Sequence, residues 1–289
     1  MRRNHTLIAG FYMDGRWVEA NKACVPATDR GFLFGEAVFE TMRTWNGKPF
    51  ALSLHLERLK NSARAIGLDL PLSIPELRKI LESFLENVGG DVSRINYRFR
   101  IILTTGDGKK PALYVHAEPF SMPSWIYEEG VRVGISKFRR IPVESCPPAI
   151  KFLSRPDILL SRFSKDDFYD LIMLNTHGNV VEGTFSNVFF VIDGRLVTPG
   201  IESGILPGIT RMVVLNMAKR LELPVEERPV ELWEVYSASE MFLTHTSGGI
   251  VPVKRFLDKL YISTSVNGLT RLLMDNLGDE ISSNDMYWL

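Results

Sequence analysis

The stretch that most constrains the fold is NVVEGTFSNVFFV, at residues 179–191. Its second half is strongly apolar, which predicts a buried strand. Glu182 stands directly before the small residues that lead into this strand. A glutamate at that place is either an exposed charge in a hairpin or a buried carboxylate directed at a cationic ring.

Further along the chain, GILPGITR at residues 204–211 predicts a tight turn that leads into a helix. The N-terminus of a helix carries partial positive charge and unpaired backbone N–H groups, and both attract phosphate. Thr210 either adds a hydroxyl donor to such a phosphate site or serves only as the N-cap of the helix.

A second candidate anion site is THTSGGIVPV, at residues 244–253. Thr246 and Ser247 precede two glycines, so successive backbone N–H groups could point at one anion. The alternative is an ordinary loop with a glycine pair at the end of a strand.

Lys151 follows two prolines and an apolar pair in the segment PPAIKFLSRPD. Desolvation in such surroundings favours the neutral, nucleophilic form of a lysine. The alternative is a lysine whose aliphatic stem is buried while its ammonium group reaches water.

These stretches belong to an ordered series: DRGFLFGEAVFETMR, HLERL, IKFLSR, NVVEGTFSNVFFV, TPGIESGILPGITR and FLTHTSGGIVPV. The series resembles the fold-type IV (class IV) pyridoxal-phosphate enzymes, which comprise branched-chain aminotransferases, D-amino-acid aminotransferases and aminodeoxychorismate lyases. The resemblance runs from about Asp14 to about Val253, nearly the whole chain. It implies an α+β fold of two domains, with a smaller N-terminal α/β sandwich and a larger C-terminal β-rich pseudo-barrel with helices.

The resemblance implies pyridoxal 5'-phosphate as the cofactor and a role for each matching position. Lys151 would hold the cofactor as a Schiff base and move the proton of the substrate α-carbon. Glu182 would pair with the pyridine nitrogen and keep it protonated. Arg58, in HLERL, would grip the phosphate. Further cofactor contacts would come from Ile209, Thr210 and Thr246 on the phosphate and from Leu206 on the ring face.

The substrate-binding positions match the family pattern only in part. Branched-chain aminotransferases carry a tyrosine and an arginine two residues apart where this chain has Arg98 and Arg100, so only Arg100 matches. They also place a tyrosine where this chain has Pro156, and the D-amino-acid and lyase branches often have an arginine in place of Thr105. The other candidate substrate residues are Phe34, Phe39, Ser247 and Gly248.

The leading interpretation is therefore a transaminase that moves an amino group between an amino acid and a 2-oxo acid, similar to the branched-chain aminotransferases. The alternatives are an aminodeoxychorismate lyase that releases pyruvate, a D-amino-acid transaminase, and a cofactor-binding protein without turnover. The resemblance also implies a homodimer.

Arg98 and Arg100 share one face of their predicted strand, because side chains two residues apart in a strand point the same way. The apolar residues that alternate with them should pack on the helices. Two neighbouring guanidinium groups need compensation from solvent, from a carboxylate such as Glu40, or from a bound dianion. We therefore expect Arg98 to bind the second carboxylate of a dicarboxylic substrate.

The predicted elements divide the chain into a smaller domain over residues 1–118, a linker over 119–130 and a larger domain over 131–289. The linker prediction rests on two prolines and the absence of any clear period.

Two turns and two helices are predicted within the first domain. Asp14-Gly15 and Asn46-Gly47 indicate hairpin turns. Helices are expected in LSLHLERLKNSARAIGL and in SIPELRKILESFLENVG, the second with Ser73 as its N-cap and Gly89 as its stop.

The composition excludes several classes of function. Lysine plus arginine and aspartate plus glutamate each number 34, which argues against nucleic-acid or membrane-surface partners. We interpret the basic cluster of Lys137, Arg139 and Arg140 as the solvated end of a strand. No apolar run approaches the ~20 residues that cross a bilayer, and the five histidines lack metal-ligand spacing. Two cysteines far apart in sequence fit a cytoplasmic protein.

Overall fold

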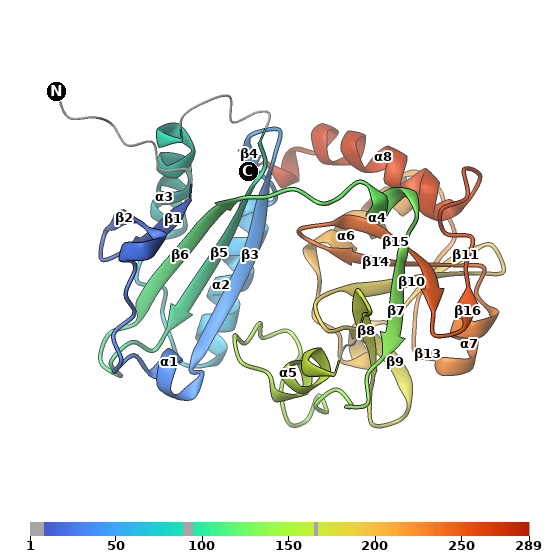
Figure 1. Ribbon diagram of the computed structural model, residues 1–289, viewed down its shortest axis with the longest axis horizontal. Helices are drawn as coiled ribbons and strands as arrows, with labels where there is room; N and C mark the ends of the chain where they lie inside the picture. Colours follow the sequence, from blue (N-terminus) through green and yellow to red (C-terminus); the bar gives the residue numbers. More distant parts are fainter. Residues whose placement is uncertain (1–8, 89–94, 165–166, 289) are drawn as a thin grey trace. The chain divides into compact units, whose positions relative to one another are not determined.

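The chain forms two compact units in a computed structural model that describes residues 9–88, 95–164 and 167–288 (Figure 1). The first unit holds the residues up to Ser121, the segment Ile150–Ser154 and the residues from Asp285 onward. The second unit holds Met122–Ala149 and Arg155–Asn284. The division predicted from sequence placed residues 150–154 in the larger domain, whereas in the structure they belong to the first unit.

The first unit contains a six-stranded antiparallel sheet in the order β2-β1-β6-β5-β3-β4. Its strands are β1 (Gly10–Met13), β2 (Arg16–Glu19), β3 (Ala37–Trp45), β4 (Lys48–Pro49), β5 (Tyr97–Thr104) and β6 (Ala112–Pro119). Both predicted hairpin turns are confirmed: they join β1 to β2 and β3 to β4. Asp14-Gly15 has φ values of 48° and 78°, and Asn46-Gly47 has 49° and 79°, as a turn with two left-handed residues requires.

Helices α2 (Leu52–Ala65) and α3 (Ile74–Asn87) confirm the two helix predictions and cover one face of this sheet (Figure 1). Their apolar faces pack with the buried residues of β3, β5 and β6 in one core. The predicted N-cap of α3 is also correct, because Ser73 and Glu76 form a reciprocal capping box. The predicted stop at Gly89 lies outside the described residues. The unit's short elements are η1 (Ala20–Lys22), α1 (Arg30–Phe34) and η3 (Asp285–Tyr287).

The segment Ile150–Ser154 returns to the first unit by binding along β3. Phe152 bridges to Val38, the Phe39 N–H donates to the Lys151 carbonyl at 3.0 Å, and the Leu153 N–H donates to the Ala37 carbonyl at 2.9 Å. Lys151 is thus fixed against the sheet by backbone contacts on both sides of it.

The second unit is built on a curved sheet in the order β12-β11-β10-β14-β15-β7-β8-β9-β13, with β16 beside β15. Its strands are β7 (Val131–Ile135), β8 (Asp170–Leu174), β9 (Asn179–Gly183), β10 (Asn187–Ile192), β11 (Arg195–Thr198), β12 (Val225–Glu227), β13 (Val230–Glu231), β14 (Glu240–His245), β15 (Gly249–Phe256) and β16 (Lys259–Leu260). The sheet is mixed, since β7 pairs in parallel with both β8 and β15.

Five helices and a short turn of 3-10 helix flank the described part of this sheet. They are α4 (Trp125–Glu128), α5 (Pro156–Phe163), η2 (Ile201–Ser203), α6 (Ile209–Arg220), α7 (Leu232–Ser237) and α8 (Leu269–Ser283). Helices α6 and α8 lie against each other and against β14 (Figure 1). None of the helices in the described ranges combines the length and the apolar character that crossing a membrane would need.

Candidate active site

Lys151 is the predicted cofactor lysine, and the first unit holds it on three sides. Its N–H donates to the Ser62 hydroxyl at 3.2 Å, and its carbonyl accepts from Phe39. Its ammonium nitrogen lies 4.9 Å from the centre of the Phe39 ring. The face of an aromatic ring attracts a cation without donating or accepting a proton. The Phe39 ring therefore contributes to the orientation of the Lys151 side chain.

Arg58 is the predicted phosphate-binding residue, and in this unit it is fixed by Glu40. The Arg58 Nε donates to Glu40 Oε1 at 2.5 Å and its Nη2 donates to Oε2 at 2.9 Å. His55 also contacts Oε2, at 2.8 Å from its Nδ1. The Glu40 side chain is wholly buried. Burial alone would raise the pKa of Glu40, but Arg58 and His55 outweigh it and hold that pKa far below the usual value of 4.5.

The surroundings of His55 favour its neutral form. Burial lowers the pKa of His55 by more than the neighbouring Glu40 raises it. A neutral ring that contacts a carboxylate through Nδ1 carries its proton there, so Nδ1 donates and Nε2 is a bare acceptor. Within the described residues Nε2 has no hydrogen-bond partner.

Arg98 and Arg100 lie on β5, as expected, but the carboxylate that compensates their charge is not the one suggested from the sequence. Arg98 pairs with Glu118, which lies opposite it on β6, and stacks over Phe120. The suggestion that Glu40 compensates this pair is wrong, because Glu40 binds Arg58 and His55. Arg100 lies over the Phe39 ring at 4.9 Å.

The prediction that the opposite face of β5 packs on the helices is confirmed. Tyr97, Phe99 and Ile101 are buried in the core beneath α2 and α3. Phe34, by contrast, is largely exposed at the end of α1.

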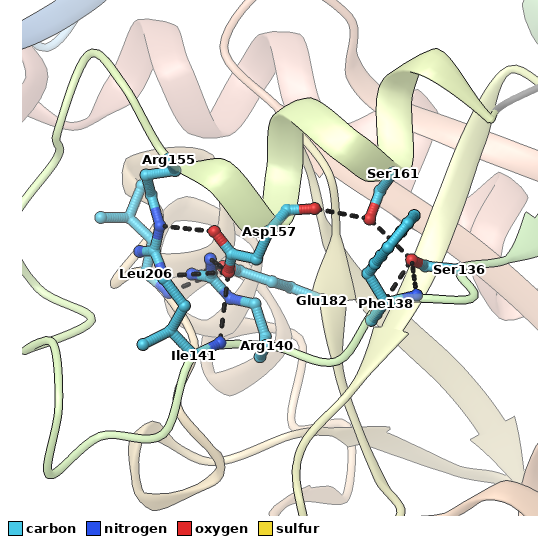
Figure 2. Close-up of polar contacts among 9 residues, drawn as sticks. All are labelled: Ser136, Phe138, Arg140, Ile141, Arg155, Asp157, Ser161, Glu182 and Leu206. Atoms are coloured by element: carbon cyan, nitrogen blue, oxygen red, sulfur yellow. Dashed lines mark hydrogen bonds and ion pairs between the residues drawn. The ribbon is translucent and has the colours of Figure 1, made fainter. Parts of the chain in front are cut away.

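Glu182, at the end of β9, is a buried carboxylate of the second unit (Figure 2). Its Oε1 accepts from Arg140 Nη2 at 2.5 Å. Its Oε2 accepts from Asn187 Nδ2 and from the Leu206 N–H, both at 3.0 Å. The alternative of an exposed hairpin charge is therefore wrong. Three donors from different segments fix the orientation of this carboxylate.

Arg140 joins Glu182 to a second buried carboxylate, as Figure 2 shows. Its Nη1 donates to Asp157 Oδ2 at 3.0 Å, and Arg155 also pairs with this oxygen at 3.2 Å. Burial would raise the pKa of Asp157, but Arg155 and Arg140 outweigh it and lower that pKa. The interpretation of Arg140 as part of a solvated basic cluster is wrong, since it is 2% exposed. Nothing local in the sequence marks it, because its partners lie 17 and 42 residues away.

The turn before α6 leads into the helix without a side-chain cap. Gly208 is the N-cap and makes no side-chain cap bond, and Thr210 is the second residue of the helix. The alternative of Thr210 as N-cap is therefore wrong. A Cβ at Gly208 would collide with Asn187 Oδ1, so the turn needs a glycine there. Asn187 also donates to the Leu206 carbonyl at 3.0 Å, which ties this turn to Glu182.

The second predicted anion site is the turn Thr246–Gly248, which connects β14 to β15. Gly249 opens β15 with a φ of 67°. The N–H of Gly248 donates to Nδ1 of His245 at 3.1 Å. The expectation that the successive N–H groups all face one anion is thereby revised, because the Gly248 N–H is engaged inside the turn.

Comparison with known proteins places this geometry in a family. The sequence model described as Amino-transferase class IV matches residues 37–256. A "Probable branched-chain-amino-acid aminotransferase" of Thermotoga maritima is 44% identical over 253 residues, which cover 88% of this chain and 89% of the relative. An aminodeoxychorismate lyase of Bacillus subtilis is 28% identical over 88% of this chain and 89% of its own length.

Solved structures support the same relationship. A crystal structure from Thermotoga maritima, named for branched-chain amino acid aminotransferase activity, superposes with a TM-score of 0.90 at 38% identity. The superposition covers 97% of this chain and 98% of the other.

The buried Glu40 gives a prediction about pH. Because its folded pKa lies below 4.5, the pair stabilises the protein above about pH 4.5 and loses that contribution as the pH falls further. We expect Glu40→Gln to lower the free energy of unfolding by about 3 kcal/mol at pH 7. The deficit relative to the unmutated protein should shrink below pH 4.5. Urea unfolding of the apoprotein at several pH values measures both effects.

Glu118→Gln is the matched control for this experiment. Glu118 also pairs with an arginine, but both side chains are about one-third exposed. Its loss should cost less than about 1 kcal/mol at pH 7. Equal losses for the two variants, or a Glu40→Gln deficit independent of pH, would contradict the assignment.

Proposed function

This chain belongs to the amino-transferase class IV family, and we propose that it transfers the amino group of a branched-chain amino acid to a 2-oxo acid. The observation that carries the substrate proposal is the 44% identity to a branched-chain-amino-acid aminotransferase over most of both chains. The lyase relative matches over a similar length at only 28% identity.

The residues present suit pyridoxal 5'-phosphate, the cofactor of this family. A dianionic phosphate needs cationic and N–H donors, and the chain offers Arg58 and the uncapped N-terminus of α6. A pyridine ring needs a carboxylate protected from water, and Glu182 is one. The cofactor supplies an aldehyde that takes up the amino group and a ring that withdraws electrons from the substrate α-carbon.

Lys151 is the proposed base. Its Nζ would hold the cofactor through the cofactor's aldehyde group, and it would accept and return the proton of the substrate α-carbon. The Phe39 ring lies 4.9 Å from this nitrogen and would help to orient the side chain.

Glu182 is the proposed partner of the pyridine nitrogen. Its two oxygens are already held by Arg140, Asn187 and Leu206, so the carboxylate would meet the ring without rearranging. Asp157 shares the charge of Arg140, which leaves more of the negative charge of Glu182 for the ring.

The remaining contacts are proposed from the family resemblance. Arg58 would bind the phosphate while Glu40 keeps its guanidinium in place. The other cofactor contacts would be Leu206 on the ring and Ile209, Thr210 and Thr246 on the phosphate.

The substrate contacts are also proposals. They would be Phe34, Phe39, Arg98, Arg100, Ser247 and Gly248. Arg98 would bind the second carboxylate of a dicarboxylic substrate, in competition with Glu118 or through the N–H groups that Glu118 does not engage.

A homodimer and a cytoplasmic location complete the proposal. Helix α1 exposes Phe32, Leu33 and Phe34 next to one another. Three large apolar side chains on one turn are costly in water and suit contact with a second copy. The two described cysteines are unpaired, as they would be in a reducing compartment.

The first test of function is the reaction itself. Purified holoenzyme should convert a branched-chain amino acid only when a 2-oxo acid acceptor is present. Release of pyruvate without any acceptor would favour the lyase instead. Borohydride should fix the cofactor to Lys151, as peptide mass spectrometry would show. Lys151→Ala should lose at least 1,000-fold in kcat, roughly the loss expected for a residue that is both attachment point and base.

Lys254→Ala is the control for this variant, because Lys254 is an exposed lysine on β15. It should keep the kcat of the unmutated enzyme. A Lys151→Ala enzyme with appreciable turnover in the absence of added amine would refute the assignment of the base.

The second test concerns Glu182. We expect Glu182→Gln to retain the cofactor but lose more than about ten-fold in kcat, because a neutral amide no longer favours the protonated ring. Nitrogen-15 NMR of labelled cofactor should report a deprotonated pyridine nitrogen. Glu234→Gln removes another mostly buried carboxylate, which pairs with Arg228, and should leave both readouts unchanged. An unaltered NMR shift in Glu182→Gln would place this carboxylate elsewhere.

The third test is assembly. Sedimentation velocity at micromolar concentration should give about twice the chain mass of 32.8 kDa. Phe32→Asp should shift the protein towards monomer, because a charge replaces an apolar contact. Val266→Asp, at another highly exposed apolar residue, should not. A fully active monomer would overturn the proposal.

A further inference from the structure

The turn Thr246–Gly248 is held at Gly248, whose backbone N–H and carbonyl are both hydrogen-bonded to side chains. The N–H of Gly248 donates to His245 Nδ1 at 3.1 Å. The carbonyl of Gly248 accepts from the Tyr127 hydroxyl, on α4, at 2.9 Å. These two bonds fix the two successive peptide groups that meet at the Gly248 Cα, and with them the orientation of the turn.

The contacts of His245 select one tautomer of its ring. A nitrogen that accepts from a backbone N–H carries no proton, so in the neutral ring the proton is on Nε2. That nitrogen lies 2.9 Å from the Tyr169 hydroxyl oxygen, which can accept it. Phe185 packs edge-on against the ring, with 5.3 Å between the centroids. Both nitrogens and one edge of His245 are thus in defined contacts.

The space taken by this ring also accounts for the glycine at position 248. A Cβ on Gly248 would lie 2.7 Å from Cε1 and Nε2 of His245, and 2.8 Å from a methyl group of Val251. Contacts this short do not occur between such atoms, so the turn can approach the ring only because residue 248 has no side chain. The histidine and the glycine form one packed unit.

We propose that His245 is a positioning residue for the substrate carboxylate. It would not touch the substrate. Through the Gly248 N–H it would hold the turn Thr246–Gly248 in the conformation that binds the carboxylate. This inference rests on the proposed function, which places Ser247 and Gly248 beside the substrate.

The proposal predicts where a loss of His245 should appear in the kinetics. A turn that binds the carboxylate does so equally in the ground state and in the transition state, because the carboxylate does not react. Losing its orientation therefore raises KM and leaves kcat nearly unchanged. A role in the chemistry would instead lower kcat.

Three substitutions separate the hydrogen bond from the shape of the ring. His245→Leu and His245→Phe remove the acceptor, and phenylalanine keeps a ring. His245→Asn keeps an acceptor, because its Oδ1 can occupy the place of Nδ1. We expect KM for a branched-chain amino acid to rise at least ten-fold in His245→Leu and His245→Phe, with kcat within two-fold. His245→Asn should restore KM to within about three-fold of the unmutated enzyme, about 0.6 kcal/mol.

A binding measurement makes the test independent of turnover. The probes are 4-methylvaleric acid, which has a carboxylate and no amino group, and 3-methylbutylamine, which has an amine and no carboxylate. Titration of holoenzyme should show weaker binding of the acid in His245→Leu and His245→Phe, recovered in His245→Asn. Binding of the amine should be the same in all variants. Circular dichroism and bound cofactor establish that each variant is folded.

The possible failures are distinct. If the unmutated enzyme transaminates and binds the acid, but His245→Leu does so equally well, the role of His245 is refuted and the proposed function stands. Equal weakening of acid and amine would mean a general structural defect and would also refute it. If the unmutated enzyme neither transaminates nor binds the acid, the proposed function itself fails.

Discussion

The burial of Glu182 is the constraint on which the second unit's site depends. A carboxylate removed from water is costly unless donors replace its hydration, and here three do so. The donors come from the segment after β7, from β10 and from the turn before α6. Segments far apart in the sequence must therefore meet at one side chain before the site exists. Any one of them out of place would leave a buried charge unsatisfied.

The same constraint explains why Arg140 is buried with a second carboxylate. Under the proposed function, one arginine facing Glu182 alone would neutralise the negative charge that is to meet the pyridine nitrogen. Asp157 divides that arginine's charge, and Arg155 in turn offsets Asp157, so two cations and two anions share the cluster. Replacing such a cluster with well-packed apolar residues is often neutral for stability, whereas removing one member leaves a buried charge unpaired. The pair of Glu40 and Arg58 follows this rule in the first unit.

How much of the fold could be predicted from the sequence depends on how far apart in the sequence the interacting residues lie. Hairpins at Asp14-Gly15 and Asn46-Gly47, and helices α2 and α3, follow from local turn chemistry and periodicity, and the structure bears them out. Strand β15 is harder to predict from its sequence, because Pro252 interrupts its apolar run and glycines open it. A carboxylate near Arg98 could be expected from the sequence, but identifying it as Glu118 instead of Glu40 requires the register between β5 and β6.

The same difference between local patterns and contacts of distant residues applies to the candidate site. Lys151, Glu182 and Thr210 stand in short motifs whose residues are neighbours in the chain, so the sequence alone marks them. The side chains that hold such groups in place stand in no motif. Arg140, Asp157 and Tyr169 are found only when the fold brings them to their partners. Since the reactive groups are those of a family with several activities, the differences among those activities must arise from how the groups are held and what surrounds them. The supporting residues are therefore where the specificity of this chain should be sought.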